Sequence, residues 1–318
     1  MDINFNKDGK SETLNFTIGD ELVTRYYTTG YAKPIFWPVN APGGVPLTRN
    51  YPPPAGQAND HPHQKSAWFC HGDVVAEGTD LKSGIKNIEG VDFWSEAKGH
   101  GDIICTKVGA VKRSDHGASV TTNNEWRTAE GKKIMDETRT ISLYDLGKNA
   151  RLIVVDIDLL ASVCPITFAD TKEGAFGIRI NDVINAEVAR KGKPAGKGKI
   201  QNAEGKIGEK ECWGLISPWC DYSGPVEGKE VGITIFADPK NKYASCWHVR
   251  GYGLMAANPF GRDKHAKFPA VKGNNELVKL AKGEHLQMRY GMLLHTGDAI
   301  TGEVAQQYKR FLALRGKN

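Results

Sequence analysis

The sequence predicts an all-β protein, an antiparallel β-sandwich or barrel with one helix at its C-terminus. Three observations predict this class: apolar and polar residues alternate along many segments, turn-forming residues are abundant, and a single segment has helical periodicity. Alternation with a period of two is typical of strands that bury one face. The 36 Gly and 15 Pro among 318 residues favour many turns. Because few helical patterns separate the strands, we expect antiparallel pairing.

The clearest strand covers residues 152–160. The odd positions from Ile153 to Leu159 are all apolar, whereas Asp156 and Asp158 take alternate positions, so one face of this strand is expected to be buried. The same alternation occurs at 231–235 and, over a longer run, at 286–294, where the even positions are apolar. Further strands are expected at 22–28, 103–112, 119–127 and 132–144.

One helix is predicted, at about 302–314, with Thr301 as its candidate N-cap. Its apolar residues follow the spacing i, i+4, i+7 and i+8, and they are Val304, Tyr308, Phe311 and Leu312. Such a helix is expected to pack on the outside of a sheet. Residues 190–210 are rich in Gly and Lys and nearly free of apolar residues, which predicts an exposed loop, either a hairpin tip or a lid.

Composition limits the class of protein. Hydrophobic residues make up 40% of the chain and charged residues 25%, as in ordinary globular proteins, and we expect one β-sandwich domain over residues 1–318. The longest apolar stretch, 152–169, contains aspartates, so no membrane helix and no membrane partner are expected. The 42 basic and 37 acidic residues are mixed along the chain, and their net charge of +5 predicts no nucleic-acid partner.

The six cysteines form no C-x-x-C pair, which argues against a zinc ribbon or a redox motif. We expect them to be small buried hydrophobic residues, and a disulfide between Cys212 and Cys220 is an alternative in an oxidising compartment. The N-terminus lacks the apolar core of a signal peptide. The protein is therefore expected in the cytoplasm, or in the periplasm or secreted if Met1 was added to a trimmed chain.

The densest polar cluster lies at residues 60–73. If this segment is extended, His61 and His63 project to one face, as in H-x-H pairs that hold a metal in β-barrel enzymes, and His71 shares a face with Asp73. A metal needs a third ligand, and the Glu that would complete such a motif is absent here. Three roles stay open for these histidines: metal ligands, acid/base or hydrogen-bonding groups, and parts of a structural loop.

Two further segments carry candidate binding residues. Within 246–254, alternation places His248 and Arg250 on one face. A guanidinium is a permanently charged fork of donors and an imidazole exchanges protons near neutral pH, so this pair suits a carboxylate or polyhydroxylated ligand. A structural salt bridge of Arg250, and a simple turn at Asn258, are the alternatives. Arg289 and His295 lie opposite the apolar row of 286–294, where they face solvent unless that sheet is concave.

Motifs for nucleotide binding and for serine hydrolases are missing. The chain contains no G-x-G-x-x-G loop, Walker P-loop, G-x-S-x-G elbow or H-E-x-x-H helix, so no nucleotide cofactor is expected. The seven tryptophans, Trp68 among them, offer surfaces on which a sugar ring can stack, although most of them are expected in the core.

Several blocks of the sequence occur together in one known family. They are Asp60-His61-Pro62-His63 with Trp68-Phe69-Cys70-His71-Gly72-Asp73, Thr167-Phe168-Ala169-Asp170-Thr171-Lys172-Glu173-Gly174 with Gly177-Ile178-Arg179, and Trp247-His248-Val249-Arg250 with Tyr252-Gly253-Leu254 and Asn258-Pro259-Phe260-Gly261. In these blocks the chain resembles the bacterial PmoA-like family, often labelled methane oxygenase, over residues 22–295.

The resemblance implies a β-sandwich of the supersandwich or jelly-roll-like kind, in bacteria rich in glycan-degrading genes. The methane monooxygenase subunit that shares the label spans the membrane several times, and this sequence has no candidate span. The family usually has a second His where this chain has Gln64. A glutamine is a poor metal ligand, which weakens a metal site here.

We expect a carbohydrate-active enzyme, a hydrolase or a lyase, that acts on a glycoside or sugar derivative by His-based acid/base chemistry. Its partner is then a small molecule or an oligosaccharide. The alternatives are a non-catalytic glycan-binding module and an oxygenase with a divalent metal on His61, His63 and a carboxylate. The expected catalytic residues are His61, His63, His71, His248 and Arg250, and the expected substrate-binding residues are Trp68, Asp73, Asn258, Arg289 and His295. We expect the first three histidines to line one pocket with at least one of His248, Arg250, Arg289 or His295.

Overall fold

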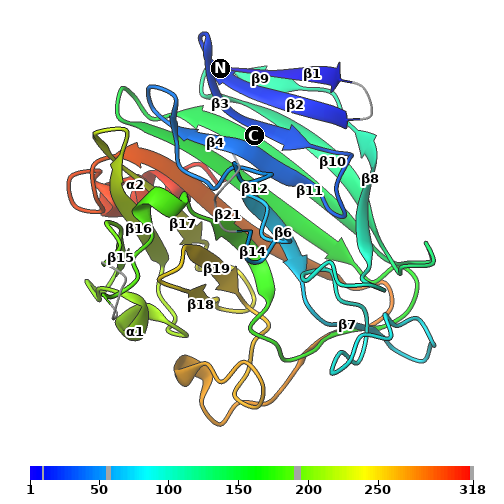
Figure 1. Ribbon diagram of the computed structural model, residues 1–318. Coiled ribbons are helices and arrows are strands. Elements are labelled where there is room, and N and C mark those ends of the chain that lie inside the picture. Colours follow the sequence, from blue (N-terminus) through cyan, green and yellow to red (C-terminus); the bar gives the residue numbers. More distant parts are fainter. Residues whose placement is uncertain (9–10, 55–58, 190–194, 316–318) are drawn as a thin grey trace.

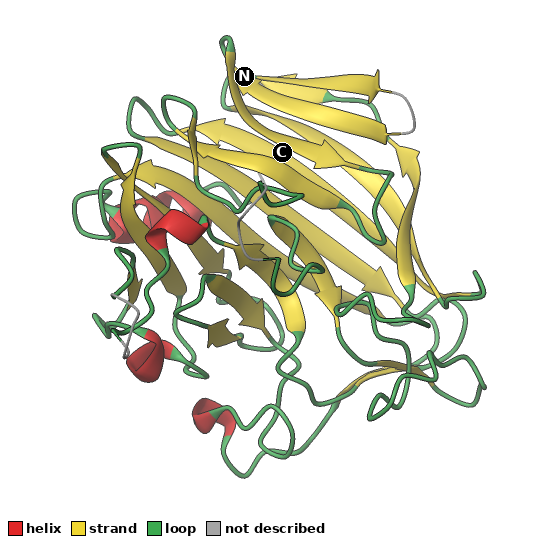
Figure 2. Cartoon of the chain, viewed as in Figure 1, coloured by secondary structure: helices red, strands yellow, loops and turns green. Residues whose placement is uncertain are grey.

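Two large antiparallel sheets, stacked face to face, form the body of the protein (Figures 1 and 2). The computed structural model describes residues 1–8, 11–54, 59–189 and 195–315. In these parts of the chain, strands predominate and the helical segments are few and short apart from one at the C-terminus. The predicted class, an antiparallel β-sandwich with a C-terminal helix, is confirmed.

The first sheet has nine strands in the order β1-β2-β3-β4-β6-β14-β19-β18, with β5 paired to β4. Its strands are β1 (Asp2–Asp8), β2 (Ser11–Ile18), β3 (Glu21–Tyr27), β4 (Ile35–Ala41), β5 (Val45–Pro46), β6 (Ala67–His71), β14 (Gly174–Arg179), β18 (Cys246–Val249) and β19 (Leu254–Asn258). Because β14 lies between β6 and β19, the sheet brings together three polar segments that are far apart in the sequence.

The second sheet also has nine strands, in the order β15-β16-β17-β21-β12-β11-β10-β8, with β9 paired to β10. Its strands are β8 (Asp102–Val108), β9 (Lys112–Ser114), β10 (Gly117–Arg127), β11 (Lys133–Asp145), β12 (Ala150–Leu160), β15 (Lys199–Asn202), β16 (Trp219–Val226), β17 (Lys229–Ala237) and β21 (His285–Thr296).

Short elements complete the fold. A small sheet has the order β20-β13-β7, formed by β7 (Val74–Ala76), β13 (Ile166–Phe168) and β20 (Val278–Leu280). The helices are the 3-10 turns η1 (Asp182–Ile184) and η2 (Pro269–Val271), and the α-helices α1 (Glu209–Cys212) and α2 (Val304–Ala313). No helix of the described residues is long and apolar enough to cross a membrane.

One apolar cluster fills the space between the two large sheets. Phe176 of β14 stacks on Tyr290 of β21, with ring centroids 5.5 Å apart, and so joins the sheets directly. The odd residues of β12 from Ile153 to Leu159 belong to this cluster, as do the even residues of β21 from Leu286 to Leu294. The alternation read from the sequence therefore identified the correct buried face of both strands.

The helix α2 covers only part of the outer face of the second sheet. Phe311 packs in one cluster with Leu152 and Val154, which lie on the outer face of β12. Further along the same face, β12 carries Asp156 and Asp158. The outer face of β12 is thus apolar where the helix covers it and polar where it does not, which explains why the alternation changes character along the strand.

Several local expectations were wrong. Glu303, with φ of 52° and no side-chain cap, precedes α2, whereas the predicted N-cap Thr301 uses its hydroxyl in the preceding turn, where it accepts from the Asp298 amide at 2.9 Å. Residues 103–112 form the two strands β8 and β9 rather than one. Of the predicted loop 190–210, residues 190–194 lie outside the described part, and the rest includes β15 and the start of α1, because Ile200 is buried and β15 pairs with β16.

All six cysteines are free thiols. Five are buried, as the sequence predicts, and Cys105 on β8 is partly exposed. The alternative disulfide is not formed, since the Cys212 thiol bonds to the carbonyl of Lys206 at 3.3 Å. Burial raises the pKa of Cys220 well above its usual value, and it raises the pKa of Cys105 as well. These thiols are therefore poor nucleophiles in the folded protein.

Candidate functional site

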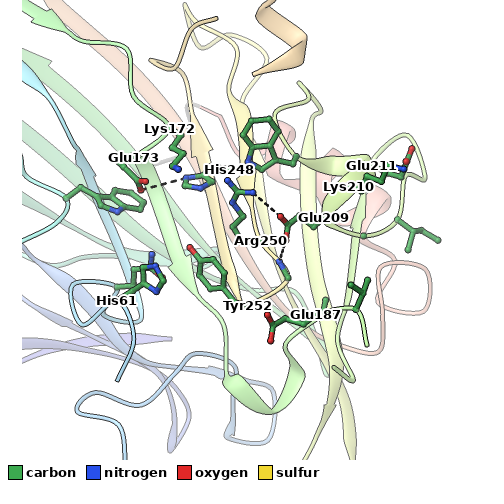
Figure 3. Close-up of a pocket in the computed structure, with 18 of the residues that line it drawn as sticks. His61, Lys172, Glu173, Glu187, Glu209, Lys210, Glu211, His248, Arg250 and Tyr252 are labelled. Carbon is green, nitrogen blue, oxygen red and sulfur yellow. Dashed lines mark hydrogen bonds and ion pairs between the residues drawn. The ribbon is translucent and has the colours of Figure 1, made fainter. Parts of the chain in front are cut away.

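A cavity of about 1120 Å³ lies at the end of the first sheet where β14, β19 and β18 meet. Six parts of the chain form its walls: the turn at 61–64, residues 94–95, residues 172–173 before β14, residues 186–188, the hairpin of β18 and β19, and α1 with the residues around it (Figure 3). The cavity is thus assembled from segments that start almost 200 residues apart. Its lining combines carboxylates, imidazoles, cations and aromatic rings.

The centre of the cavity wall is a pair formed by Glu173 and His248. His248 Nδ1 lies 4.0 Å from Glu173 Oε2 (Figure 3). His248 is only 2% exposed, and its Nδ1 makes no hydrogen bond with the described residues. Its neighbours Trp247 and Val249 are in the core, so the strand alternation turns the imidazole toward the cavity. A buried polar atom without a partner is costly, and here it faces a space that a ligand can enter.

Burial moves the pKa values of this pair in opposite directions. Burial, together with the charges of Arg250 and Lys172, lowers the pKa of His248 to about 3. Burial raises the pKa of Glu173, against the opposing charge of Lys172. Both shifts favour the uncharged form of each side chain. At neutral pH the imidazole is therefore neutral, and the carboxyl holds its proton more firmly than an ordinary glutamate.

The backbone that carries Glu173 is held by its neighbours. The side-chain amide of Asn258 donates to the carbonyls of Thr171 and Lys172, both at 3.0 Å, while its oxygen accepts from backbone amides of the following turn. The Gly72 amide donates to the Glu173 carbonyl at 2.7 Å. Asn258 was expected to bind substrate. It is fully buried behind the cavity wall, where it positions residues 171–173 instead.

His61 lies in the turn of 61–64 and lines the cavity, where its ring stacks on Tyr252. Its ring is parallel to that of Tyr252, with centroids 5.0 Å apart, and its Nδ1 pairs with Asp60 at 2.8 Å. Asp60 also accepts from Arg49 and Arg179. Burial raises the pKa of Asp60, but the hydrogen bond with His61 and the two arginines outweigh it and lower the pKa to about 2. Asp60 is therefore a charged anchor that fixes His61.

His63 shares the cavity with His61, although not for the reason the sequence suggested. The segment is a turn, and His61 has a left-handed φ of 47°, so the two rings meet edge to face at 5.8 Å rather than side by side on a strand. Burial and the charge of Lys33 lower the pKa of His63 to about 4. The Gln64 oxygen accepts from Arg179 at 2.9 Å, so that atom is already used within the protein.

Arg250 follows β18 and reaches across to α1. The Arg250 guanidinium donates to Glu209 at 2.9 Å and lies over the Trp213 ring, 5.1 Å from its centroid. The second oxygen of Glu209 accepts from the Gly251 amide at 2.6 Å. Arg250 is thus held in place by an ion pair and a cation–π contact, while its side chain stays about one quarter exposed, at 26%. Arg250 therefore forms a salt bridge, which was one alternative, and also lines the cavity.

A protein family matches nearly the whole chain. Residues 13–309 fit DUF6807, a family of unknown function. This protein belongs to DUF6807. No curated protein matches its sequence. The resemblance to the PmoA-like family stays a prediction.

Solved structures similar to this DUF6807 protein share little sequence with it. A galactose mutarotase-like protein from Lactobacillus casei is 11% identical, with a TM-score of 0.39, and the match covers 92% of this chain and all of that chain. An aldose epimerase homologue from C. elegans is 10% identical, with a TM-score of 0.32 and coverage of 92% and 99%. A heparinase III is 10% identical, with a TM-score of 0.31 and coverage of 93% and 36%.

Three expected site residues from the segment 60–73 lie outside the cavity of the DUF6807 protein. His71 is fully buried, donates to the Ala169 carbonyl at 2.8 Å and contacts Phe260 edge to face. Trp68 is fully buried in β6. Asp73 accepts from two backbone amides of a loop and borders a different, smaller cavity of about 400 Å³. The expectation that His71 lines the same pocket as His61 and His63 was wrong, because β6 is buried on both faces.

The two expected residues on β21 are also elsewhere. Arg289 pairs with Asp156 at 2.7 Å in a groove of about 600 Å³ on the outer face of the second sheet. His295 is fully buried and lies 2.8 Å from Asp221. Both belong to the second sheet, so neither can join the residues of the first-sheet cavity. The structure brings together His61, His63, His248 and Arg250.

A metal site on His61 and His63 finds no support in the donors around them. Asp60, the carboxylate that bonds to His61, is also bonded to two arginines, and the Gln64 oxygen is bonded to Arg179. In the part of the chain that the structure describes, no group of three or more His, Cys, Asp or Glu side chains is placed to hold a metal ion.

Sequence reasoning missed several cavity residues. They are Trp94, Lys172, Glu173, Glu209, Trp213 and Tyr252. Glu173 is one of many carboxylates, and no spacing rule singles it out. The signal that could have found it is its place, with Lys172, in one of the blocks that carry the family resemblance. Tyr252 lies in another of these blocks.

Proposed function

We propose that this protein is a carbohydrate-active enzyme that transfers a proton to or from a glycoside or sugar derivative in the cavity. Glu173 is the proton-transferring group, and the neutral His248 is its partner. The observation that carries the proposal is the Glu173–His248 pair, 4.0 Å apart, with the Nδ1 atom of His248 unpaired beside an open cavity. Partly buried groups with shifted pKa values in a cleft are typical of catalytic sites.

The chemistry follows from the charge states. A carboxyl whose pKa is raised toward neutrality is a better general acid near pH 7 than an ordinary glutamic acid. A neutral imidazole offers one donor and one acceptor nitrogen, so His248 can donate to a substrate oxygen on which charge develops. The same pair serves a hydrolase, where the acid protonates the leaving oxygen, or a lyase, where the carboxylate removes a proton from carbon.

A sugar suits the lining of the cavity. A pyranose ring has an apolar face that packs on aromatic rings, and Tyr252 and Trp213 line the cavity. Its hydroxyl groups suit the imidazoles and cations of the same walls. A glycan-binding module needs aromatic and amide groups but no convergence of His and Arg side chains. The convergence of His61, His63, His248 and Arg250 therefore favours an enzyme over the binding module.

The test is turnover of a panel of glycosides, uronate-containing polysaccharides and free aldoses by the wild-type protein and by Glu173→Gln and His248→Asn. Each variant is expected to lower kcat on the accepted substrate by about 10²-fold or more. The control Glu230→Gln changes an exposed residue of β17 and is expected to leave kcat unchanged. Full activity of Glu173→Gln would overturn the assignment. Oligosaccharide binding without turnover of any substrate would overturn the enzyme in favour of a binding module.

A further inference from the structure

Charge is divided unevenly between the two walls of the cavity. We call the wall made of His61, Lys172, His248 and Arg250 the His248 wall, and the wall made of Glu187, Glu209, Lys210 and Glu211 the α1 wall (Figure 3). Glu173 is the carboxyl group of the His248 wall, and burial raises its pKa. Apart from Lys210, the basic side chains lie on the His248 wall, and Arg250 meets the α1 wall through its ion pair with Glu209.

Three cationic or ionisable side chains surround His248. The charges of Arg250, Lys172 and His61 all act on its imidazole and disfavour its protonation. All three side chains line the same cavity as His248 (Figure 3). Arg250 is paired with Glu209 and His61 with Asp60, whereas Lys172 adds a positive charge that no ion pair within the described residues neutralises. The field of such a charge is focused by low-dielectric walls and favours an anionic ligand beside His248.

Each of the three has capacity left for a ligand. Lys172 is exposed and makes no ion pair with an acidic side chain of the described residues. Arg250 uses one guanidinium nitrogen for Glu209. His61 pairs with Asp60 through Nδ1, and its Nε2 makes no hydrogen bond in the described chain. Beside them, His248 Nδ1 is an unpartnered atom of a side chain that is 98% buried, since His248 is 2% exposed.

We infer that the ligand is an anionic sugar, a uronic acid whose carboxylate lies between Lys172, Arg250 and His61. This inference rests on the proposed function and names its substrate class. A carboxylate matches the planar donor fork of Arg250 and the point charge of Lys172. Glu211 of the α1 wall repels an anion, which favours the orientation in which the sugar carboxylate faces His248. The carboxylate then lies close to Glu173, where the proposed proton transfer takes place.

The test measures binding, so that it does not depend on turnover. Ligand-observed NMR with the full-length protein compares glucuronate and galacturonate with glucose and galactose, which differ from them only at C6. We expect the uronates to bind at least about 10-fold more tightly, and to lose this preference as the salt concentration rises. Lys172→Met is expected to remove most of the preference. Lys279→Met, which changes an exposed lysine of β20, is the matched control and is expected to keep it.

The outcomes separate this inference from the proposed function. Equal binding of uronates and neutral sugars, with Glu173-dependent turnover of neutral glycosides, would overturn the inference and leave the enzyme in place. Preference for glucose 6-sulfate or glucose 6-phosphate over the uronates would overturn the assignment of a carboxylate. A uronate preference that Lys172→Met leaves intact would overturn the placement of the anion. Absence of both sugar binding and turnover would overturn both proposals.

Discussion

Two buried histidines of this protein lie beside carboxylates, yet their surroundings differ. His248 of β18 is 2% exposed and lies 4.0 Å from Glu173, with Nδ1 unpaired at an open cavity. His295 of β21 is fully buried and lies 2.8 Å from Asp221, whose same oxygen accepts from the Thr234 hydroxyl at 2.7 Å. His295 Nδ1 is 3.2 Å from the Thr296 carbonyl. Both nitrogens of His295 have partners within the protein.

Close packing also leaves no space around the His295 ring. A Cβ atom at Gly232 would lie 2.4 Å from the His295 ring, and one at Gly302 would lie 2.3 Å from it, so glycine is required at both positions. The comparison teaches that a histidine beside a carboxylate is no sign of function by itself. The pair around His295 uses both imidazole nitrogens within the protein, while Asp221 Oδ2 is buried with no hydrogen-bond partner among the described residues. The pair around His248 leaves an atom free at a cavity, and only that pair can act on a ligand.

The largest effect is expected from removing the carboxylate of the closed site. Asp221→Ala leaves His295 and Thr234 buried without their acceptor, and we expect the free energy of unfolding to fall by about 3–5 kcal/mol. Urea denaturation followed by circular dichroism measures it. The matched control is Asp158→Ala, which breaks a histidine–aspartate pair of the same length, 2.8 Å, with the exposed His285. That change is expected to cost less than about 1 kcal/mol. Equal losses would refute the contrast.

The next effect separates the two histidines by activity. His248→Asn is expected to lower kcat on the accepted sugar substrate by about 10²-fold, whereas His295→Asn is expected to keep kcat per folded molecule unchanged. Kinetics at 25 °C on protein shown to be folded by circular dichroism gives both values. A loss of kcat in His295→Asn as large as in His248→Asn would show that the closed pair also serves the reaction.

A pH effect sharpens the description of the open site. Burial lowers the pKa of His248 from 6.5 in the unfolded chain to about 3 in the folded protein. The stability that this group contributes is fully present above pH 6.5 and is lost as the pH falls from 6.5 toward 3. Between pH 7.5 and pH 5 the wild-type protein should therefore lose about 2 kcal/mol more than His248→Asn. Denaturation curves at the two pH values test this, and parallel losses would contradict it.

The smallest effect concerns one hydroxyl of the closed site. Thr234→Val keeps the shape of the side chain and removes the donor to Asp221, which is expected to cost about 1–2 kcal/mol of stability. Thr121→Val, on the same outer face of the second sheet, removes a hydroxyl that pairs at 2.8 Å with Thr140 in a partly exposed place, and is expected to cost less. Thermal denaturation of the two variants ranks them, and the reverse order would argue against a tightly closed site around His295.

Much of the second sheet could be predicted from the sequence, and less of the first. β12 and β21 bury one face against the core, so their apolar residues alternate and reveal both the strand and its buried face. β6 and β14 have every residue buried, so alternation is lost and neither was identified as a strand. Because β6 was not recognised as a buried strand, His71 and Trp68 were expected in the polar site. Both side chains are instead buried in the core and do not line the cavity.

The candidate site was predictable only where alternation applied. His248 and Arg250 were placed on one face because Trp247 and Val249 alternate with them in a strand. His61 and His63 reached the cavity through a turn that the sequence did not reveal. Glu173 could not be singled out, because its proximity to His248 depends on how β14 and β19 pair, and pairing between distant strands leaves no mark in local spacing.

The thiols of this chain provide a direct way to count unfolded molecules. Five of the six cysteines are inaccessible in the native fold, and Cys105 sits on the edge strand β8. A short pulse of a thiol-reactive dye should therefore label native protein at one position at most and unfolded protein at six. Mass spectrometry of the labelled chains would then report the unfolded fraction of every variant above in the same tube as its kinetic assay.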